Sequence, residues 1–229
     1  MKVAHIILSV ILISQLMIPL YAQKKKVQSE IVARYRPRTF TIIMDEKQRF
    51  SDKQLDDHFA LYKGYVNKRN EIDATLATTP RTNQNITFSP FRGLKISETF
   101  ARNGALLHEL YFENIKAETT VGKQTLQAIL ENFDSLEAFK DDLMACAKCA
   151  RGWAITCYNL DDGRIQNYVL DAHNEKVPML VIPLLVLDTY EHAYMIDFGI
   201  NRAQYLEILW NNINWDIVEE RVIQWIGGE

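Results

Sequence analysis

The chain has 229 residues, of which 48% are hydrophobic and 24% charged, and its formal net charge at pH 7 is −3. A chain of this length forms one large domain or two small ones with a substantial core. The weak negative charge argues against nucleic acid as a partner. A disulfide-held scaffold would need more than the three cysteines present, and an odd count leaves at least one thiol unpaired.

The first 22 residues have the pattern of a removable secretory signal peptide. Lys2 supplies a positive start, residues 6–18 form an apolar core, and Ala22 ends a cleavage site that is followed by lysines 24–26. The apolar run is short for a membrane anchor, although an uncleaved anchor is the alternative, and no other stretch is apolar enough to span a bilayer. We therefore expect an exported protein, periplasmic or secreted, with no membrane association after cleavage.

Residues 23–50 are polar and basic and predict an extended lead-in to a helical domain over residues 51–120. Ser51 and Gln54 have the spacing of a capping box, in which both side chains satisfy backbone N–H groups at the start of a helix. The apolar residues that follow are spaced by one, three and four, which indicates one face of a long helix. His58 lies on that face. The members of the face are Leu55, His58, Phe59, Tyr62, Tyr65 and Val66.

A second helix is predicted over residues 96–115, after a loop over residues 78–90 that is rich in Thr, Asn and Pro. His108 lies on its apolar stripe, together with Phe100, Leu107, Tyr111 and Phe112. Each of the two predicted helices therefore carries one histidine on the face that it buries. A single histidine in such a place is more often a core residue than a ligand. The two histidines therefore indicate a metal site only in combination with further ligands elsewhere in the chain.

Residues 121–229 predict a second domain of mixed α and β structure. Helices are expected over 124–133 and 136–149, strands over 153–158, 165–171 and 181–187, and helices over 202–210 and 215–225. The sequence Asp-Asp-Gly at 161–163 predicts a hairpin turn between the first two strands. Helices followed by strands among helices indicate the α+β class, with a three-stranded sheet in the second domain.

The end of the third strand carries the most informative group of residues. Asp188 and His192 are a carboxylate and an imidazole four positions apart, directly after the apolar run 181–187. A charge that is buried beside such a run must be paired or bound to a metal. If both side chains turn inward, they supply half of a site for a first-row metal, and His58 and His108 are the candidates for the other half.

Several segments together resemble the iron/manganese superoxide dismutase family, from about residue 50 to the C-terminus. They are Asp188–Tyr194, with the spacing Asp-x-x-Glu-His, then His108–Phe112, His58 with Tyr65–Asn67, Arg151–Trp153, and Tyr205–Trp215. The resemblance implies a helical-hairpin N-terminal domain, a C-terminal domain with a three-stranded antiparallel sheet, and one Fe or Mn per subunit held between them. It also implies the reaction, which converts superoxide to dioxygen and hydrogen peroxide.

The resemblance further implies the metal ligands, which are His58, His108, Asp188 and His192. Three imidazoles and one carboxylate suit both iron and manganese. The family supplies a hydrogen bond to the metal-bound solvent from one of two places. One of them is Gly104 here, which has no side chain to offer, so the resemblance assigns this bond to His173 in the loop before the third strand.

Other residues around the metal follow from the same resemblance. Tyr65 is expected to be the gateway tyrosine, with Tyr62 as its competitor. Tyr65 lies seven residues after His58, where the family usually has eight. Seven residues are two helical turns, so Tyr65 still faces the ligand side of the helix. Trp153 is expected to line the cavity. Glu191 is expected to reach the partner subunit of a homodimer. Tyr190 replaces the tryptophan that the family has before its Glu-His pair, and it adds a hydroxyl near the metal.

Two alternatives remain beside the dismutase hypothesis. The first is a dismutase-like protein that binds metal but has weak or no turnover and serves as a binding or interaction module, which Tyr190 and the shortened spacing would favour. The second is a thiol oxidoreductase that uses Cys146 and Cys149, whose spacing is that of a redox motif. No strand precedes this pair, so we interpret both cysteines as ordinary helix residues, with an incidental disulfide as the alternative.

Overall fold

The computed structural model describes residues 34–227, so the predicted signal peptide and the first part of the lead-in lie outside the described residues. The described chain divides into two compact units. The smaller contains residues 34–36 and 66–98, and the larger contains residues 37–65 and 99–227. Two long helices, α2 (Asp52–Thr78) and α3 (Pro90–Glu113), each have residues in both units.

In the smaller unit, the end of α2 is joined to the start of α3 by the connection over residues 79–89. The carboxamide of Asn70 accepts a hydrogen bond from the amide of Tyr35 and donates one to its carbonyl, at 3.1 and 2.8 Å. In the connection, Ile86 and Phe88 are exposed. The predicted loop over residues 78–90 is therefore confirmed, while α3 begins six residues before the predicted start.

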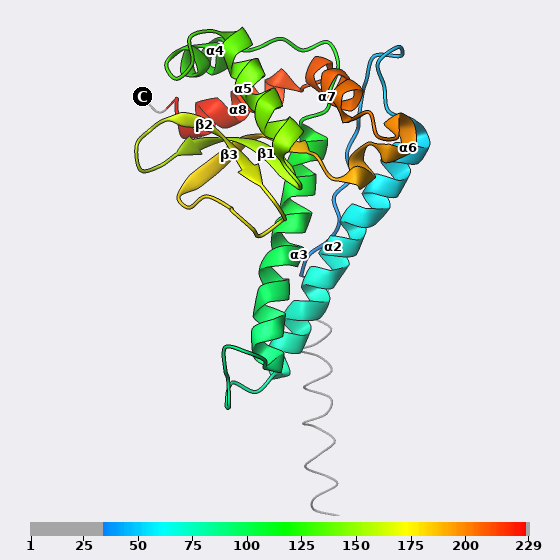
Figure 1. The fold of residues 1–229 in the computed structure, drawn as a ribbon, viewed down its shortest axis with the longest axis vertical. Coiled ribbons are helices and arrows are strands. Elements are labelled where there is room, and N and C mark those ends of the chain that lie inside the picture. The colour runs from blue at the N-terminus through cyan, green and yellow to red at the C-terminus, as the bar shows by residue number, and fades with distance from the viewer. Residues whose placement is uncertain (1–33, 228–229) are drawn as a thin grey trace, which may run out of the picture. The chain divides into compact units, whose positions relative to one another are not determined.

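The larger unit contains a three-stranded sheet and the helices that cover it (Figure 1). Its strand order is β2-β1-β3, and both pairings are antiparallel. Helix α5 packs against β1 and β2, helix α8 packs against β3, and α4 contacts α5 and α8. The elements are α4 (Lys123–Leu130), α5 (Leu136–Cys149), β1 (Trp153–Asn159), β2 (Ile165–Leu170), β3 (Val181–Asp188), a 3-10 turn η1 (Glu191–Ala193), α6 (Met195–Phe198), α7 (Arg202–Asn211) and α8 (Trp215–Trp225).

Most of these elements agree with the sequence patterns that predict them. The hydroxyl of Ser135 accepts a hydrogen bond from the Ala138 amide, which fixes the start of α5. Gly163 has a φ of +70°, a conformation that glycine adopts without strain, and it closes the turn between β1 and β2. The α+β class with a three-stranded antiparallel sheet is confirmed. Helix α6 and the η1 turn are too short to leave a periodic signal and were not predicted.

The strand β3 has one irregularity, which affects how it delivers its last residue. Trp153 pairs with Asp188, and the register continues without interruption to Thr156, which pairs with Leu185. Beyond that point the register shifts by one residue, so that Cys157 pairs with Pro183. Proline lacks an N–H group and is found in sheets at such bulges. The first residue of β1 and the last residue of β3 are therefore direct cross-strand neighbours.

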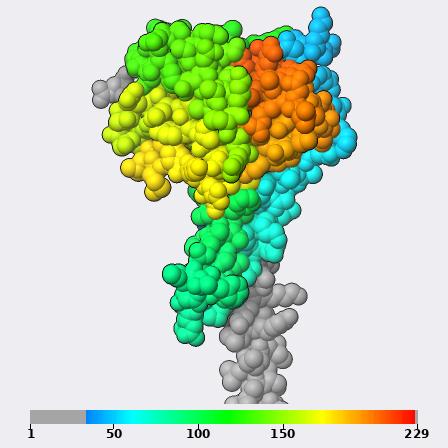
Figure 2. Space-filling view, in the orientation of Figure 1, coloured from blue at the N-terminus to red at the C-terminus, as the bar shows by residue number. Residues whose placement is uncertain are grey.

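The surface of the larger unit is continuous across these elements. In Figure 2 the helices α4 and α5 (green), the strands with their loops (yellow) and the α6–α7 segment (orange) adjoin one another without a gap. Beneath this surface the core includes Phe139, Leu143, Ile155, Leu185 and Val222, all at most 2% exposed. Among the residues that the structure describes, no helix is both long and apolar enough to cross a membrane.

Candidate metal centre

Four elements of the larger unit each bring one potential ligand to the same place. His58 lies on α2, His108 on α3, Asp188 at the end of β3, and His192 in η1. The end of β3 is held in position by two hydrogen bonds. The Tyr190 amide donates to Asp188 Oδ1 at 2.9 Å, and the Tyr205 hydroxyl donates to the Asp188 carbonyl at 2.8 Å.

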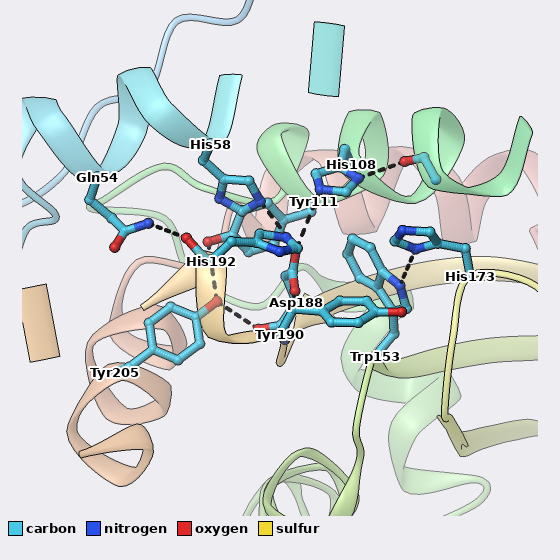
Figure 3. A network of polar contacts seen from close by, with 11 residues as sticks. Gln54, His58, His108, Tyr111, Trp153, His173, Asp188, Tyr190, His192 and Tyr205 are labelled. Atoms are coloured by element: carbon cyan, nitrogen blue, oxygen red, sulfur yellow. Dashed lines mark hydrogen bonds and ion pairs between the residues drawn. The ribbon is translucent and has the colours of Figure 1, made fainter. Parts of the chain in front are cut away.

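The four side chains converge closely, and one potential ligand atom from each lies within 4.8 Å of all the others (Figure 3). Nε2 of His58 and Nε2 of His192 each lie 3.1 Å from Asp188 Oδ2, and Nε2 of His108 lies 3.6 Å from the same oxygen. His58, His108 and Asp188 are at most 2% exposed. The structure thus places together the four residues that the sequence analysis named as metal ligands.

The hydrogen bonds of His108 leave one ring nitrogen ready for a metal. Its Nδ1 lies 2.6 Å from the Gly104 carbonyl oxygen, so Nδ1 carries the proton and donates. Its Nε2 then has a free lone pair, and this buried atom has no hydrogen-bond partner among the described residues. A buried polar atom without a partner is costly, and metal-ligating histidines commonly donate their other N–H to a carbonyl. The residues therefore fit a metal ion.

The charges of the cluster agree with this assignment. Burial by itself would raise the pKa of Asp188, but the neighbouring His192 and hydrogen bonds from His192 and His58 outweigh it and hold the pKa below its usual value. Burial lowers the pKa of His58, and it lowers the pKa of His108 to about 3. These two imidazoles are thus neutral, which is the state that binds metals. Three imidazoles and a carboxylate form a donor set that suits iron or manganese.

Of the two tyrosines considered for the gateway, only Tyr65 faces the neighbourhood of the metal cluster. Its ring centroid lies 5.3 Å from that of His108 and 4.7 Å from that of His173. The hydroxyl of Tyr62 is engaged elsewhere, because it donates to Glu109 at 2.8 Å and accepts from the Arg38 amide at 2.9 Å.

His173 lies close to the cluster although it comes from the loop before β3. Its side chain is fully buried, and its ring centroid is 5.8 Å from that of His108. The indole N–H of Trp153 donates to its Nδ1 at 3.0 Å, while its Nε2 has no partner among the described residues. Burial lowers the pKa of His173 to about 4. The structure thus brings His173 and Trp153 close to His108, and the hydrogen bond from His173 to a metal-bound solvent stays a prediction.

The remaining two predicted residues flank His192. The ring of Tyr190 stacks on that of His192 with centroids 5.2 Å apart and an interplanar angle of 17°. Burial and the charge of Asp188 raise the pKa of Tyr190 to about 12, so its phenol is neutral at physiological pH. Glu191 is exposed on the surface.

Sequence patterns missed the role of Gln54. Ser51 caps α2 as predicted, because its hydroxyl accepts from the Gln54 amide. The other half of the predicted capping box, a hydrogen bond from the Ser51 amide to the Gln54 side chain, is wrong. The Ser51 amide donates to Asp197, and the side chain of Gln54 donates to the His192 carbonyl at 2.5 Å. Gln54 is one helical turn before His58, so the same face of α2 carries a ligand and a contact to another ligand's backbone.

A pair of buried tyrosines was also not predicted as part of the site. The hydroxyls of Tyr111 and Tyr205 lie 3.2 Å apart, and Tyr205 in turn holds the Asp188 carbonyl. The only signal in the sequence was the place of Tyr111 three residues after His108.

At the end of α5, Cys146 and Cys149 are free thiols, and burial raises the pKa of Cys146 to about 11, which does not suit a redox site.

Comparisons with known proteins agree with this geometry. Residues 121–221 match the family described as iron/manganese superoxide dismutases, C-terminal domain. The chain is 42% identical over 179 residues to the superoxide dismutase [Fe] of Aquifex pyrophilus and to that of Aquifex aeolicus, which covers 75% of this chain and 83% of each relative. It is 30% identical over 161 residues to the superoxide dismutase [Mn] 2 of Haloferax volcanii, covering 69% of this chain and 79% of that protein. Four converging ligands and relatives of this similarity lead to one conclusion: the chain belongs to the iron/manganese superoxide dismutase family.

Proposed function

We propose that this protein is an exported superoxide dismutase that holds one Fe or Mn per subunit with His58, His108, Asp188 and His192. The convergence of their four ligand atoms within 4.8 Å carries the proposal. The unpartnered Nε2 of His108 supports it, because a metal would satisfy that buried atom. Relatives named for iron and for manganese support either metal.

The reaction consumes two superoxide anions and two protons and forms one dioxygen and one hydrogen peroxide. A bound iron or manganese ion would supply the one-electron chemistry, accepting an electron from one superoxide and returning it to the next. The chain's own residues supply everything else. Asp188 contributes the single negative charge of the ligand set, and the hydrogen bond that its carboxylate accepts from the Tyr190 amide keeps it in place.

Protons are the second requirement, and two side chains are placed to handle them. Burial raises the pKa of Tyr65, so its phenol keeps its proton. The unpartnered Nε2 of His173 is available to donate a hydrogen bond to solvent at the site. The rings of Trp153, Tyr65 and Phe100 pack against His173, whose side chain is fully buried from bulk water.

We further propose that two copies associate through residues 191–200, the segment around and after the last metal ligand. Glu191 is exposed there, next to His192. Three large apolar side chains are exposed in the same short segment: Met195 at 44%, Ile196 at 45% and Ile200 at 93%. Exposed apolar groups that lie together commonly mark an interaction surface. Glu191 would then contact the partner subunit near its metal centre.

The central experiment measures metal content and superoxide decay on one sample of the mature protein. We expect about one Fe or Mn per chain and a decay rate far above that of the same concentration of free metal ion. His108→Ala is the matched variant, because it removes one ligand from the interior of α3, and it should lose both metal and activity. A rate no higher than that of free metal would contradict the proposal and would leave the alternative, a metal-binding module.

The thiol alternative is tested in the same assay. The double variant Cys146→Ser, Cys149→Ser should retain dismutase activity, since neither thiol contacts the cluster. Loss of activity in this variant with metal retained would favour the thiol oxidoreductase.

Export and assembly need separate measurements. Mass spectrometry of the protein recovered from the periplasm or the medium should find a chain that begins at Gln23. Recovery only from the cytoplasm with residues 1–22 attached would contradict export. Light scattering should give the mass of a dimer, and Glu191→Ala should weaken it; a wild-type monomer at micromolar concentration would contradict the proposed interface.

A further inference from the structure

Of the four residues of the metal cluster, His192 has the weakest local support. His58 and His108 lie on long helices and Asp188 ends a strand, and all three are at most 2% exposed. His192 lies instead in the three-residue turn η1, and its side chain is 26% exposed. A 3-10 turn has poorer hydrogen-bond geometry than an α-helix, and one of this length does not hold its shape by itself. The position of His192 is therefore set by contacts with other elements.

Gln54, in the first turn of α2, makes such a contact (Figure 3). Its side-chain Nε2 donates to the His192 carbonyl oxygen at 2.5 Å, and the residue is 1% exposed. His58 follows Gln54 by four residues, so both lie on one face of the helix. The helix that carries one ligand thus also holds the backbone of another.

The start of α2 also holds the segment that follows His192. The carboxylate of Asp197, in α6, accepts hydrogen bonds from the amide and the hydroxyl of Ser51, at 2.7 and 2.6 Å. These bonds are made five residues after His192 and fix the course of the chain there. The bond from Gln54, in contrast, is made to the backbone of the ligand itself.

The carboxamide of Gln54 adds little to the stability of the fold. Its Oε1 is buried and has no hydrogen-bond partner among the described residues. An unpaired buried acceptor costs at least as much free energy as one ordinary hydrogen bond gains. An unbranched apolar side chain of the same length would therefore leave the fold about as stable. The carboxamide is then accounted for by what its Nε2 does at His192.

We propose that Gln54 is a positioning residue that holds His192 in the geometry of the metal site and thereby slows the loss of the ion. An ion leaves such a site as its bonds to the ligands break one after another, and the ligand that moves most easily goes first. Here that ligand is His192, on its short turn. The inference rests on the ligand set of the proposed function, but it does not depend on turnover.

The test removes the donor and follows the metal. Gln54→Met keeps an unbranched side chain of similar length but cannot donate to the His192 carbonyl. In the mature protein loaded with Co²⁺, release of the ion to excess EDTA should be about tenfold faster than in the wild type, a usual effect of changes next to metal ligands. The visible absorption of bound Co²⁺ depends on ligand geometry and should shift. The urea midpoint of the metal-free protein should stay nearly unchanged.

Asn70→Leu is the matched control on the same helix. The carboxamide of Asn70 is also buried, but it bonds the backbone of Tyr35 through both its oxygen and its nitrogen, twelve residues after His58. This variant should lower the urea midpoint of the metal-free protein and leave both the release rate and the absorption of Co²⁺ unchanged. The two variants therefore separate an effect on the site from an effect on the fold.

Two results overturn the proposal. One is a release rate in Gln54→Met equal to that of the wild type, and the other is the same acceleration in Gln54→Met and Asn70→Leu. If Gln54→Met does not fold, Gln54→Ala, which removes the side chain without adding bulk, applies the same test.

The failure of this proposal and that of the dismutase function can be told apart. A protein without dismutase activity in which Gln54→Met speeds Co²⁺ release would overturn the function and leave the role of Gln54 standing. An active protein in which Gln54→Met leaves release unchanged would do the reverse.

Discussion

A methyl group on Gly104 would lie 3.2 Å from Cδ2 of His173, so the glycine on α3 leaves the space that the imidazole fills. The same methyl group would lie 2.9 Å from Cδ1 of Tyr65. These separations are shorter than the contact distance between carbon atoms. The backbone of Gly104 also accepts the hydrogen bond of the ligand His108. One residue without a side chain thus makes room for two neighbours of the metal centre.

Gly104→Ala should therefore reduce activity even though alanine favours helices. We expect a loss of about tenfold in superoxide decay, the usual size of effect when groups around a metal are displaced, with metal content retained. Gly93→Ala is the matched control on the same helix, because nothing lies within 4 Å of the new methyl group. It should be active and more stable by up to about 1 kcal/mol. Equal behaviour of the two variants would contradict the packing argument.

The two tyrosines of α2 should separate activity from stability. Tyr65→Phe should lower the decay rate, because it removes the hydroxyl of a ring that packs against both His108 and His173. Tyr62→Phe should leave the rate nearly unchanged but should lower the free energy of unfolding by about 1–2 kcal/mol, since its hydroxyl bonds Glu109 and the Arg38 amide. Superoxide decay and urea unfolding of both variants check this. The reverse pattern would make Tyr62 the gateway.

Removal of the metal should lower thermal stability. A ligand present at a thousand times its dissociation constant stabilises the folded state by about 4 kcal/mol, which is roughly 10 °C in a protein of this size. Calorimetry before and after chelation measures the difference. Asp188→Asn should unfold at the same temperature with and without added metal, because it loses the charged ligand. A metal-dependent shift in that variant would place the ion elsewhere.

Stability at acid pH should depend on Glu219. This carboxylate accepts hydrogen bonds from the Gln124 and Thr125 amides and from the Thr125 hydroxyl at the start of α4. Burial would raise its pKa, but these bonds outweigh burial and hold the pKa below the usual 4.5. The folded state therefore favours the ionised form, and its contribution is complete above pH 4.5 and is lost as the pH falls through the lowered pKa.

Glu219→Gln should cost about 1 kcal/mol at pH 7. The difference from wild type should shrink as the pH falls below 4.5, and unfolding in urea at several pH values measures it. Glu207→Gln, an exposed change on α7, should have no such effect. A difference that grows in acid would contradict the sign of the pKa shift.

The periodic elements and the ligands were predictable because both leave a local signal. His58 and His108 lie on apolar helix faces, and Asp188 follows a buried apolar run, so burial of each could be inferred from its neighbours. The same is true of the Ser135 cap and of the turn at Gly163. Each of these features depends on residues within one helical turn or one strand.

Features that depend on distant partners were not predictable. Gln54 has the spacing of a capping residue, and only the fold shows that Asp197, 146 residues after Ser51, takes that place. The bond between Tyr205 and the Asp188 carbonyl, and that between Trp153 and His173, likewise join separate elements. Helix α6 is too short to form without tertiary contacts.

His58 and Asp188 are 130 positions apart, yet their side chains meet at 3.1 Å. Most of the polypeptide, up to His192, must therefore be synthesised before all four ligands can bind one ion. If the leader carries the chain across a membrane before it folds, the cation is chosen from whatever the destination offers, since sites of this kind select among first-row metals largely by availability. The metal content of the compartment in which the chain folds, rather than the ligand set, would then decide between iron and manganese.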